Sequence, residues 1–338
     1  MARKKKFKPA IVSDKDGIRF ATPEPVAKYR AQRLKCNTIA DISCGIGGQT
    51  IYFAAECESV YAIEIDPKKI AYARKNCEKL GIDNVEFICG DALSEEVIEQ
   101  LPQLDIVFSD PARPPNEKKR DINSLRPPIP DVLAAYKTRS SNFAFEASPQ
   151  ITPERVTFDC EKEYLSLDGK LNRLNLYFGS IKKCDVSAVA LPGNARIKSH
   201  GIEHELETAE EIASFAYEVE ESVERANLLG QLANDIKDNT PDIRLFVVDS
   251  KRSFLTSDQL IDNPLLKNRY KVLLVSNIDY NAINKYLKMH DFGKVILRAS
   301  VDPEEYWDIR VQLEAGLKGN KKAHLFLKDN MAILCELL

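Results

Sequence analysis

The hydrophobic and polar residues of this chain follow two patterns, and the first extends to about residue 195. Short apolar runs there alternate with stretches in which apolar residues recur at helical spacing. Such alternation is typical of βαβ units, so it predicts an α/β fold with a Rossmann-like parallel sheet. The predicted strands are 38–42, 60–64, 85–89, 104–109 and 142–146, with two more at 156–163 and 173–178 that are expected to close the same sheet.

One predicted helix of this region is well delimited. Asp66 can cap its N-terminus, Pro67 suits its first turn, and Gly81 follows its end. The proline-rich stretch 111–130 is predicted to form a loop beside the carboxyl edge of the sheet. The buried face of the helix is expected to consist of Ile70, Ala73, Cys77 and Leu80.

The pattern changes after residue 196. A charged helical stretch at 205–237 precedes a strand at 243–248, and the remainder reads strand, helix, strand, helix, strand, strand. This order favours a small α+β domain of ferredoxin-like type. We therefore expect a basic N-terminal extension at 1–30, the α/β domain at 31–195 and the α+β domain at 196–338.

The composition narrows the class of protein. Of 338 residues, 44% are hydrophobic and 29% are charged, and no apolar run approaches the roughly 18 residues of a membrane span. Residues Met1–Lys6 are basic but lack the apolar segment of a secretory signal, so a cytoplasmic location is expected. The net charge of −3 provides no overall basic field, so any nucleic-acid surface must be local. The eight cysteines form no CxxC pair and the four histidines show no ligand spacing, so we expect neither a metal site nor a disulfide framework.

The strongest chemical signal is a glycine-rich turn directly after the first strand. Glycine lets the backbone turn sharply and approach a ligand closely, just before the N-terminus of a helix. Nicotinamide and flavin enzymes use similar loops, so the turn alone does not identify the ligand. The candidate binding residues of the turn are Asp41, Ser43, Cys44, Gly45, Gly47 and Gly48.

The next three strands also end in candidate binding residues, at the edge where open α/β sheets bind ligands. Glu64, about 23 residues after Asp41, is placed to accept hydrogen bonds from two ribose hydroxyls. Asp91 could accept a hydrogen bond from an adenine amino group. The candidates at the three strand ends are Glu64, Ile65 and Asp66, then Gly90, Asp91 and Ala92, then Asp110 and Pro111.

These segments resemble motifs I, II and III of class I S-adenosylmethionine-dependent methyltransferases. The motifs correspond to Asp41–Gly48, Ala62–Pro67 and Phe87–Asp91, and the CGxGG turn and the IDP-x-KI sequence are most similar to the trimethylguanosine synthase type. Phe20–Glu24 is similar to the Thr-Pro-Glu lead-in of that group, which implies that Thr22 helps to close over the cofactor. The resemblance implies S-adenosyl-L-methionine as the cofactor, with Asp110 and Pro111 as the catalytic loop.

The chain as a whole resembles methyltransferases that carry a C-terminal THUMP-like domain. This resemblance implies that 31–195 is the methyltransferase domain and that 196–338 is a THUMP-like domain, which would bind RNA by analogy only. It lies in the segments Asp110–Arg113, Glu161–Ser166, Leu176–Gly179, Lys294–Arg298 and Val301–Pro303.

The loop at Asp110 favours methylation of an amine. Asp110 and the carbonyl of Pro111 could accept hydrogen bonds from an exocyclic NH₂ group and direct its lone pair at the methyl carbon. Ala112 and Arg113 stand where the usual loop has proline and an aromatic residue, and Arg113 could stack on a base or hold a phosphate. The chain lacks the tryptophan loop of trimethylguanosine synthases, which disfavours cap hypermethylation. Cys160 lacks the Ser-Cys context of uridine-5 methyltransferases, which disfavours that chemistry.

Basic residues near this loop favour RNA as the substrate. Residues 113–139 contain seven basic and three acidic side chains, and with Lys4–Lys6 and Lys8 they could follow a phosphate backbone or form a solvated face. The leading hypothesis is an RNA methyltransferase that acts on guanine N2 in tRNA or rRNA. The alternatives are a small-molecule methyltransferase whose C-terminal domain is a lid or dimer contact, and a non-catalytic RNA-binding or assembly factor. The sequence leaves the oligomeric state open.

Overall fold

The computed structural model describes residues 11–13, 22–112, 120–202, 204–299 and 301–338. The chain divides into two compact units. The first contains residues 1–201 and 221–228, and the second contains residues 202–220 and 229–338. The chain therefore leaves the first unit after Gly201, returns for the short helix α7 (Glu221–Arg225) and leaves again.

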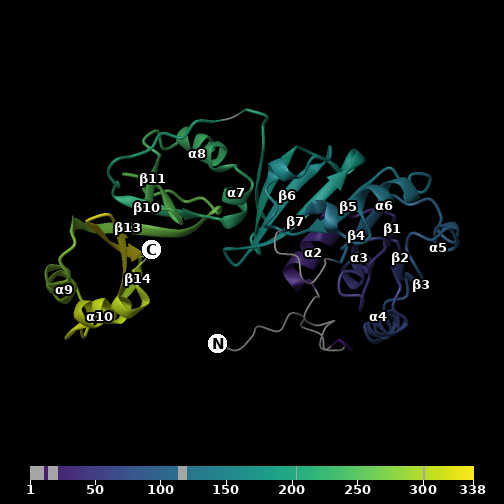
Figure 1. Ribbon diagram of the computed structural model, residues 1–338, viewed down its shortest axis with the longest axis horizontal. Coiled ribbons are helices and arrows are strands. Elements are labelled where there is room, and N and C mark those ends of the chain that lie inside the picture. Colours follow the sequence, from purple (N-terminus) through teal and green to yellow (C-terminus); the bar gives the residue numbers. More distant parts are fainter. Residues whose placement is uncertain (1–10, 14–21, 113–119, 203, 300) are drawn as a thin grey trace. The chain divides into compact units, whose positions relative to one another are not determined.

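The first unit contains a nine-stranded sheet in the order β3-β2-β1-β4-β5-β7-β6-β8-β9 (Figure 1). The five strands from β3 to β5 pair in parallel, whereas β7 joins β5 and β6 antiparallel. The parallel strands are β1 (Thr38–Asp41), β2 (Ser59–Glu64), β3 (Val85–Cys89), β4 (Ile106–Ser109) and β5 (Phe143–Ala147). The others are β6 (Glu161–Leu167), β7 (Lys170–Phe178), β8 (Val186–Leu191) and β9 (Ala195–Lys198).

Helices cover both faces of the parallel strands. In Figure 1, α3 and α4 lie on one side of these strands and α6 lies on the other. Strand β1 lies between β2 and β4, so the chain reverses its direction of winding there, and this reversal is where open α/β sheets bind ligands. The helices are α2 (Glu24–Arg33), α3 (Thr50–Glu56), α4 (Pro67–Lys79), α5 (Glu95–Glu99) and α6 (Ile129–Tyr136), with short 3₁₀ turns at Ile122–Ser124, Pro153–Arg155 and Gly179–Ile181.

The structure confirms the predicted helix α4 and corrects one residue of its face. Asp66 caps the helix by accepting a hydrogen bond from the backbone N of Lys68 at 2.8 Å. Leu80 is 39% exposed and is not part of the buried face. Asn76 is buried in its place, because its side-chain amide donates to the carbonyls of Val12 and Ile46.

The second unit contains a seven-stranded sheet in the order β11-β12-β10-β13-β16-β15-β14. One hydrophobic cluster packs β14, β15 and β16 against α9 and α10, and a second cluster joins β10–β13 with alternate residues of β15 and β16. The strands are β10 (Phe215–Val219), β11 (Arg244–Asp249), β12 (Arg252–Ser257), β13 (Leu266–Asn277), β14 (Phe292–Arg298), β15 (Lys321–Lys328) and β16 (Met331–Leu337). The helices are α8 (Leu229–Lys237), α9 (Tyr280–Met289) and α10 (Pro303–Glu314).

Two predictions for this unit are wrong in part. The domain is α+β, but its last six elements follow β-α-β-α-β-β, whereas a ferredoxin-like unit follows β-α-β-β-α-β. Helix α10 connects β14 to its parallel neighbour β15, which produces a different strand order. The predicted helix at 205–237 contains strand β10, because residues 215–219 find partners in β12 and β13 that outweigh local helical preference.

Candidate active site

The glycine-rich turn joins β1 to α3 at the carboxyl edge of the sheet. Gly45 and Gly47 have φ angles of +56° and +83°, a region that other residues rarely adopt. A Cβ atom on Gly47 would also lie 3.2 Å from the Cα and Cβ atoms of Ala73, on α4. The turn is tied to β2, because the backbone N of Cys44 donates to the carbonyl of Ile63 at 3.0 Å. Glycine is therefore required here by conformation and by the close approach of α4.

Glu64 lies at the end of β2 and faces this turn. One carboxylate oxygen accepts a hydrogen bond from the backbone N of Gly45 and the other accepts from the backbone N of Asp66, both at 3.0 Å. These two bonds fix the orientation of the carboxylate, and each oxygen retains a further lone pair. The carboxylate is therefore oriented to accept hydrogen bonds from two neighbouring hydroxyl groups, such as those of a ribose.

Asp41 is a buried carboxylate at the end of β1. Its Oδ2 accepts a hydrogen bond from the hydroxyl of Thr50 at 2.7 Å, and its Oδ1 has no hydrogen-bond partner among the described residues. Burial raises the pKa of Asp41 to about 6, and the bond from Thr50 acts in the opposite direction. A buried carboxylate oxygen without a partner is energetically costly, so this position fits a ligand that brings a donor or a positive charge.

The third strand contributes Gly90, Asp91 and Ala92 to the same edge. A Cβ on Gly90 would lie 2.7 Å from Cγ2 of Val97, so a larger residue here would displace the Val97 side chain. Asp91 is exposed and one of its oxygens accepts from the backbone N of Leu93 at 3.0 Å. Ile65, at the end of β2, is 67% exposed, so the same edge offers an apolar surface beside these acceptors.

Asp110 and Pro111 follow β4, which is the direct neighbour of β1. The backbone N of Asp110 donates to the hydroxyl of Ser43 at 2.6 Å, so the turn after β1 is connected to the loop after β4. Ala112 forms an antiparallel bridge with Arg126, through hydrogen bonds of 2.8 and 2.9 Å that hold the base of this loop. Arg113 lies outside the described residues.

Two further candidates lie close in sequence to described elements. Thr22, which precedes α2, is buried at 4% exposure, and Gly48 is buried at the start of the segment leading to α3. Sequence reasoning missed Arg30 on α2, a fully buried guanidinium that donates to Gln49 and Glu146. An arginine in the middle of a polar helix gives no signal of burial, because its partners come from distant parts of the chain.

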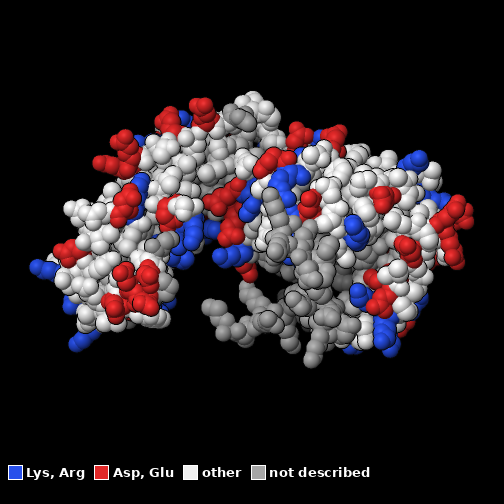
Figure 2. Space-filling view, viewed as in Figure 1, with Lys and Arg blue, Asp and Glu red and all other residues white. Residues whose placement is uncertain are grey.

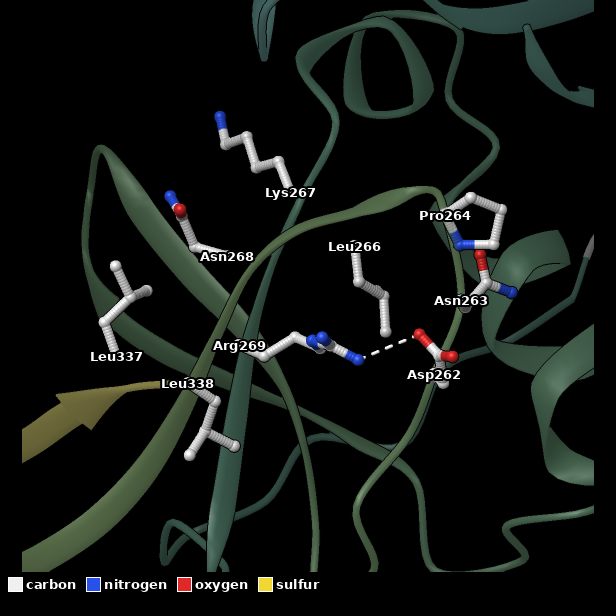
Figure 3. A pocket seen from close by; sticks show the side chains of 9 residues that line it. All are labelled: Asp262, Asn263, Pro264, Leu266, Lys267, Asn268, Arg269, Leu337 and Leu338. Atoms are coloured by element: carbon white, nitrogen blue, oxygen red, sulfur yellow. Dashed lines mark hydrogen bonds and ion pairs between the residues drawn. The ribbon is translucent and has the colours of Figure 1, made fainter. Parts of the chain in front are cut away.

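A separate cavity of about 310 Å³ lies in the second unit, at the start of β13 (Figure 3). Within it, Arg269 reaches across to Asp262 at 2.8 Å. None of the residues predicted to bind the cofactor lines this cavity. The lining residues are Asp262, Asn263, Pro264, Leu266, Lys267, Asn268, Arg269, Leu337 and Leu338.

Charges of both signs lie on the face of each unit that Figure 2 shows. Figure 2 shows lysine and arginine interspersed with aspartate and glutamate on the visible face of each unit. No group of three or more His, Cys, Asp or Glu side chains in the part of the chain that the structure describes is arranged to hold a metal ion. No helix in that part is both long enough and apolar enough to span a membrane.

Comparison with known proteins bears on both the fold and the site. A putative methyltransferase from Porphyromonas gingivalis has a similar structure, with a TM-score of 0.75 and 14% sequence identity, over 96% of this chain and 83% of that one. At this identity the similarity concerns the fold, and it includes both units.

Several curated proteins are similar in sequence to part of this chain. An uncharacterized S-adenosylmethionine-dependent methyltransferase of Mycobacterium tuberculosis is 27% identical over 166 residues, which cover 48% of this chain and 44% of the relative. Trimethylguanosine synthase of Schizosaccharomyces pombe is 35% identical over 159 residues, which cover 44% of this chain and 66% of that protein. A 23S rRNA (uracil(1939)-C(5))-methyltransferase of Shewanella amazonensis is 30% identical over 120 residues, which cover 34% of this chain and 27% of that protein. The matched regions thus span less than two thirds of these curated relatives.

The parallel sheet, the glycine turn and these similarities together identify a class I S-adenosylmethionine-dependent methyltransferase domain in the first unit. Residues 36–132 match the family model described as RNA cap guanine-N2 methyltransferase. This range includes the turn at Asp41–Gly48, the acidic strand ends and the Asp110-Pro111 loop.

Proposed function

We propose that this protein is an RNA methyltransferase that transfers a methyl group from S-adenosylmethionine to an exocyclic amine, guanine N2, of tRNA or rRNA. The observation that carries the proposal is the hydrogen bond from the backbone N of Asp110 to Ser43. It joins the loop expected to hold the amine to the turn expected to hold the cofactor. Two reactants held side by side in this way react faster, because they have less translational and rotational freedom left to lose on reaching the transition state.

We assign the cofactor contacts from the chemistry of the edge. Glu64 would accept from the ribose hydroxyls, the free oxygen of Asp41 would face the amino group of the cofactor, and Asp91 would accept from the adenine amine. Ile65 would pack against the adenine ring. Thr22, Ser43, Cys44 and the glycines complete the proposed pocket, and the cofactor supplies an electrophilic methyl carbon.

Asp110 and Pro111 would act on the substrate. The Asp110 carboxylate and the Pro111 carbonyl are both acceptors, and together they would accept hydrogen bonds from the two N–H groups of an NH₂ group and orient its lone pair. The one proton that the nitrogen loses on methylation would pass to the Asp110 carboxylate and then to water. Catalysis would then depend on positioning and on stabilising the positive charge that develops on nitrogen. Arg113 would hold a base or a phosphate next to this loop.

The proposal of RNA as the substrate draws on the family model and on the relative named as a 23S rRNA methyltransferase. The C5 chemistry named for the Shewanella relative is disfavoured, because that reaction needs a cysteine thiolate. Burial raises the pKa of the Cys160 thiol to about 12, so this thiol is protonated at neutral pH and is a poor nucleophile. We also propose that residues 196–338 form a THUMP-like domain that contacts the RNA, and that the protein acts in the cytoplasm, where tRNA and rRNA are found.

The experiment that tests the proposal is transfer of tritium from labelled S-adenosylmethionine to total RNA from cells that lack this protein. We expect label in RNA with the wild type and a loss of at least about 100-fold with Asp110→Asn. Asp131→Asn is the matched control, since Asp131 is an exposed carboxylate in the first turn of α6, and it should transfer label at the wild-type rate.

Three outcomes would contradict the proposal. Label that appears in small molecules and not in RNA would indicate the small-molecule alternative. RNA binding that Asp110→Asn leaves unchanged, together with no transfer to any RNA, would indicate a non-catalytic RNA-binding factor. Equal transfer by Asp110→Asn and Asp131→Asn would contradict the role of the Asp110 loop.

A further inference from the structure

Arg30 is a buried cation at the centre of the methyltransferase domain. Its Nη1 donates to Oε1 of Gln49 at 3.0 Å, and its Nη2 donates to Oδ1 of Asn175 at 3.0 Å and to Oε2 of Glu146 at 2.5 Å. The guanidinium carbon lies 4.9 Å from the ring centroid of Phe108. The side chain is completely inaccessible to solvent.

These partners belong to the elements that carry the candidate site. Gln49 follows the glycine turn and precedes α3, while Phe108 lies on β4, two residues before Asp110. Glu146 lies on β5, the next strand of the sheet. Gln49 also donates to the carbonyl of Ala27 on α2 at 3.1 Å. A single side chain therefore connects α2, the glycine turn and the strand that leads to Asp110.

The charges around Arg30 explain how it can act on the site. The Glu146 carboxylate is bonded by two guanidiniums, since Arg30 contacts one of its oxygens and Arg173 contacts the other at 2.5 Å. One negative charge therefore faces two positive charges. Burial acts to lower the pKa of Arg30, but Glu146 and then Asp110 raise it, with a smaller contribution from Tyr177. Asp41 is the cross-strand partner of Phe108, against whose ring the Arg30 guanidinium lies. Burial raises the pKa of Asp41 most strongly, the bond from Thr50 and then the charge of Arg30 act to lower it, and Glu64 acts to raise it.

We propose that Arg30 is a positioning residue of the active site: its hydrogen bonds to Gln49 and Glu146 and its ring contact with Phe108 hold the glycine turn against β5 and β4, and its buried positive charge favours the ionised form of Asp41. An ionised Asp41 attracts the cationic amino group of the cofactor. The inference rests on the proposed function for the contact between Asp41 and the cofactor, and the effect of Arg30 on Asp41 is measurable without RNA.

The test compares variants of two arginines on the same helix. Arg33 lies one turn after Arg30, and its guanidinium carbon is 4.5 Å from the ring centroid of Tyr177 while its Nη2 donates to Glu161. Arg33 thus matches Arg30 in helix, in aromatic contact and in carboxylate partner, but neither Asp41 nor Asp110 is among its partners. Binding of S-adenosylhomocysteine to wild type, Arg30→Gln, Arg30→Lys and Arg33→Gln is measured by calorimetry from pH 5 to pH 8.5.

The wild type is expected to lose affinity as the pH falls through about 6, where Asp41 takes up a proton. Arg30→Gln should move the midpoint of this loss measurably upward, because it removes a positive charge that favours the ionised form of Asp41. Arg30→Lys keeps the positive charge and should leave the pH midpoint near that of the wild type. The affinity of this variant for S-adenosylhomocysteine should nevertheless be lower. Arg33→Gln should lower the thermal stability without moving the midpoint.

If Arg30→Gln does not fold, Glu146→Gln tests the effect of the Arg30 charge by removing its carboxylate partner. The positive charge of Arg30 is then less balanced, so the pH midpoint of cofactor binding should move downward. An unchanged midpoint in a folded Arg30→Gln or Glu146→Gln variant, or an equal shift in Arg33→Gln, would overturn the inference. Failure of the wild type to bind S-adenosylhomocysteine at any pH would instead contradict the proposed function, so the two failures are distinguishable.

Discussion

Replacing Asp41 with asparagine should stabilise the cofactor-free protein while it weakens cofactor binding. The pKa of Asp41 is raised from 3.8 to about 6 in the folded protein. In the unfolded chain the carboxyl ionises at the lower value, so between these pH values the folded state holds a proton that the unfolded state has lost. The folded state is therefore favoured below about pH 4, and this advantage is lost as the pH rises through 6.

The size of this effect on the unfolding free energy follows from the shift in the pKa of Asp41. Two pKa units at about 1.4 kcal/mol each amount to about 3 kcal/mol of folding free energy that ionised Asp41 costs at neutral pH. Asparagine removes this cost, but it places an amide donor where Oδ1 has no described partner, which offsets about 1 kcal/mol. The net expectation is a stabilisation of about 2 kcal/mol, or a rise of about 4–8 °C in the Tm of the methyltransferase domain.

The assay is differential scanning calorimetry of wild type and Asp41→Asn at pH 4, 6 and 7.5, with and without S-adenosylhomocysteine. The difference in Tm should be close to zero at pH 4 and largest at pH 7.5. Ligand at about 100 times its Kd should add about 2.7 kcal/mol to the wild type and much less to the variant. A variant that is less stable than the wild type at pH 7.5, or a difference that does not change with pH, would refute this reasoning.

Three further predictions follow from individual contacts. Gly47→Ala should lower the unfolding free energy by about 2 kcal/mol more than Gly45→Ala in denaturant titrations. Both glycines have positive φ, but a Cβ on Gly47 meets Ala73, whereas a Cβ on Gly45 meets no described atom within 4 Å. Equal losses would contradict the close packing of α4. Glu64→Gln should weaken S-adenosylhomocysteine binding by about 10–100-fold in calorimetry, because charge-assisted acceptors for the ribose are lost, and wild-type affinity would refute the ribose contact. Cys160→Ala should keep the rate of methyl transfer to RNA, because its thiol is buried and protonated, and a loss of more than about tenfold would indicate nucleophilic catalysis.

The sequence predicted the parallel half of the first sheet well, because its signals are local. The apolar run of β3 was predicted with the bounds that the structure has, and the cap at Asp66 and the glycine at 81 delimit α4 within one chain segment. The turn residues and the acidic strand ends could be found in the same way, since each follows directly after a strand.

Features that depend on distant partners could not be predicted. Leu80 fits the helical period of α4 but is exposed. Asn76 is buried because the carbonyls of Val12 and Ile46 accept hydrogen bonds from its side-chain amide. Strand β10 looks helical on its own and becomes a strand only between β12 and β13. The burial of Arg30 depends on Gln49, Glu146 and Asn175, which lie before α3, on β5 and on β7.

The measurement that tests the central claim most directly is mass spectrometry of nucleosides from RNA incubated with this protein and S-adenosylmethionine. We expect a methylated guanosine with its methyl group on N2 for the wild type, none for Asp110→Asn, and wild-type amounts for Asp131→Asn. Methyluridine as the product, or no modified nucleoside from a protein that binds S-adenosylhomocysteine, would contradict the claim that the Asp110 loop methylates an amine of RNA.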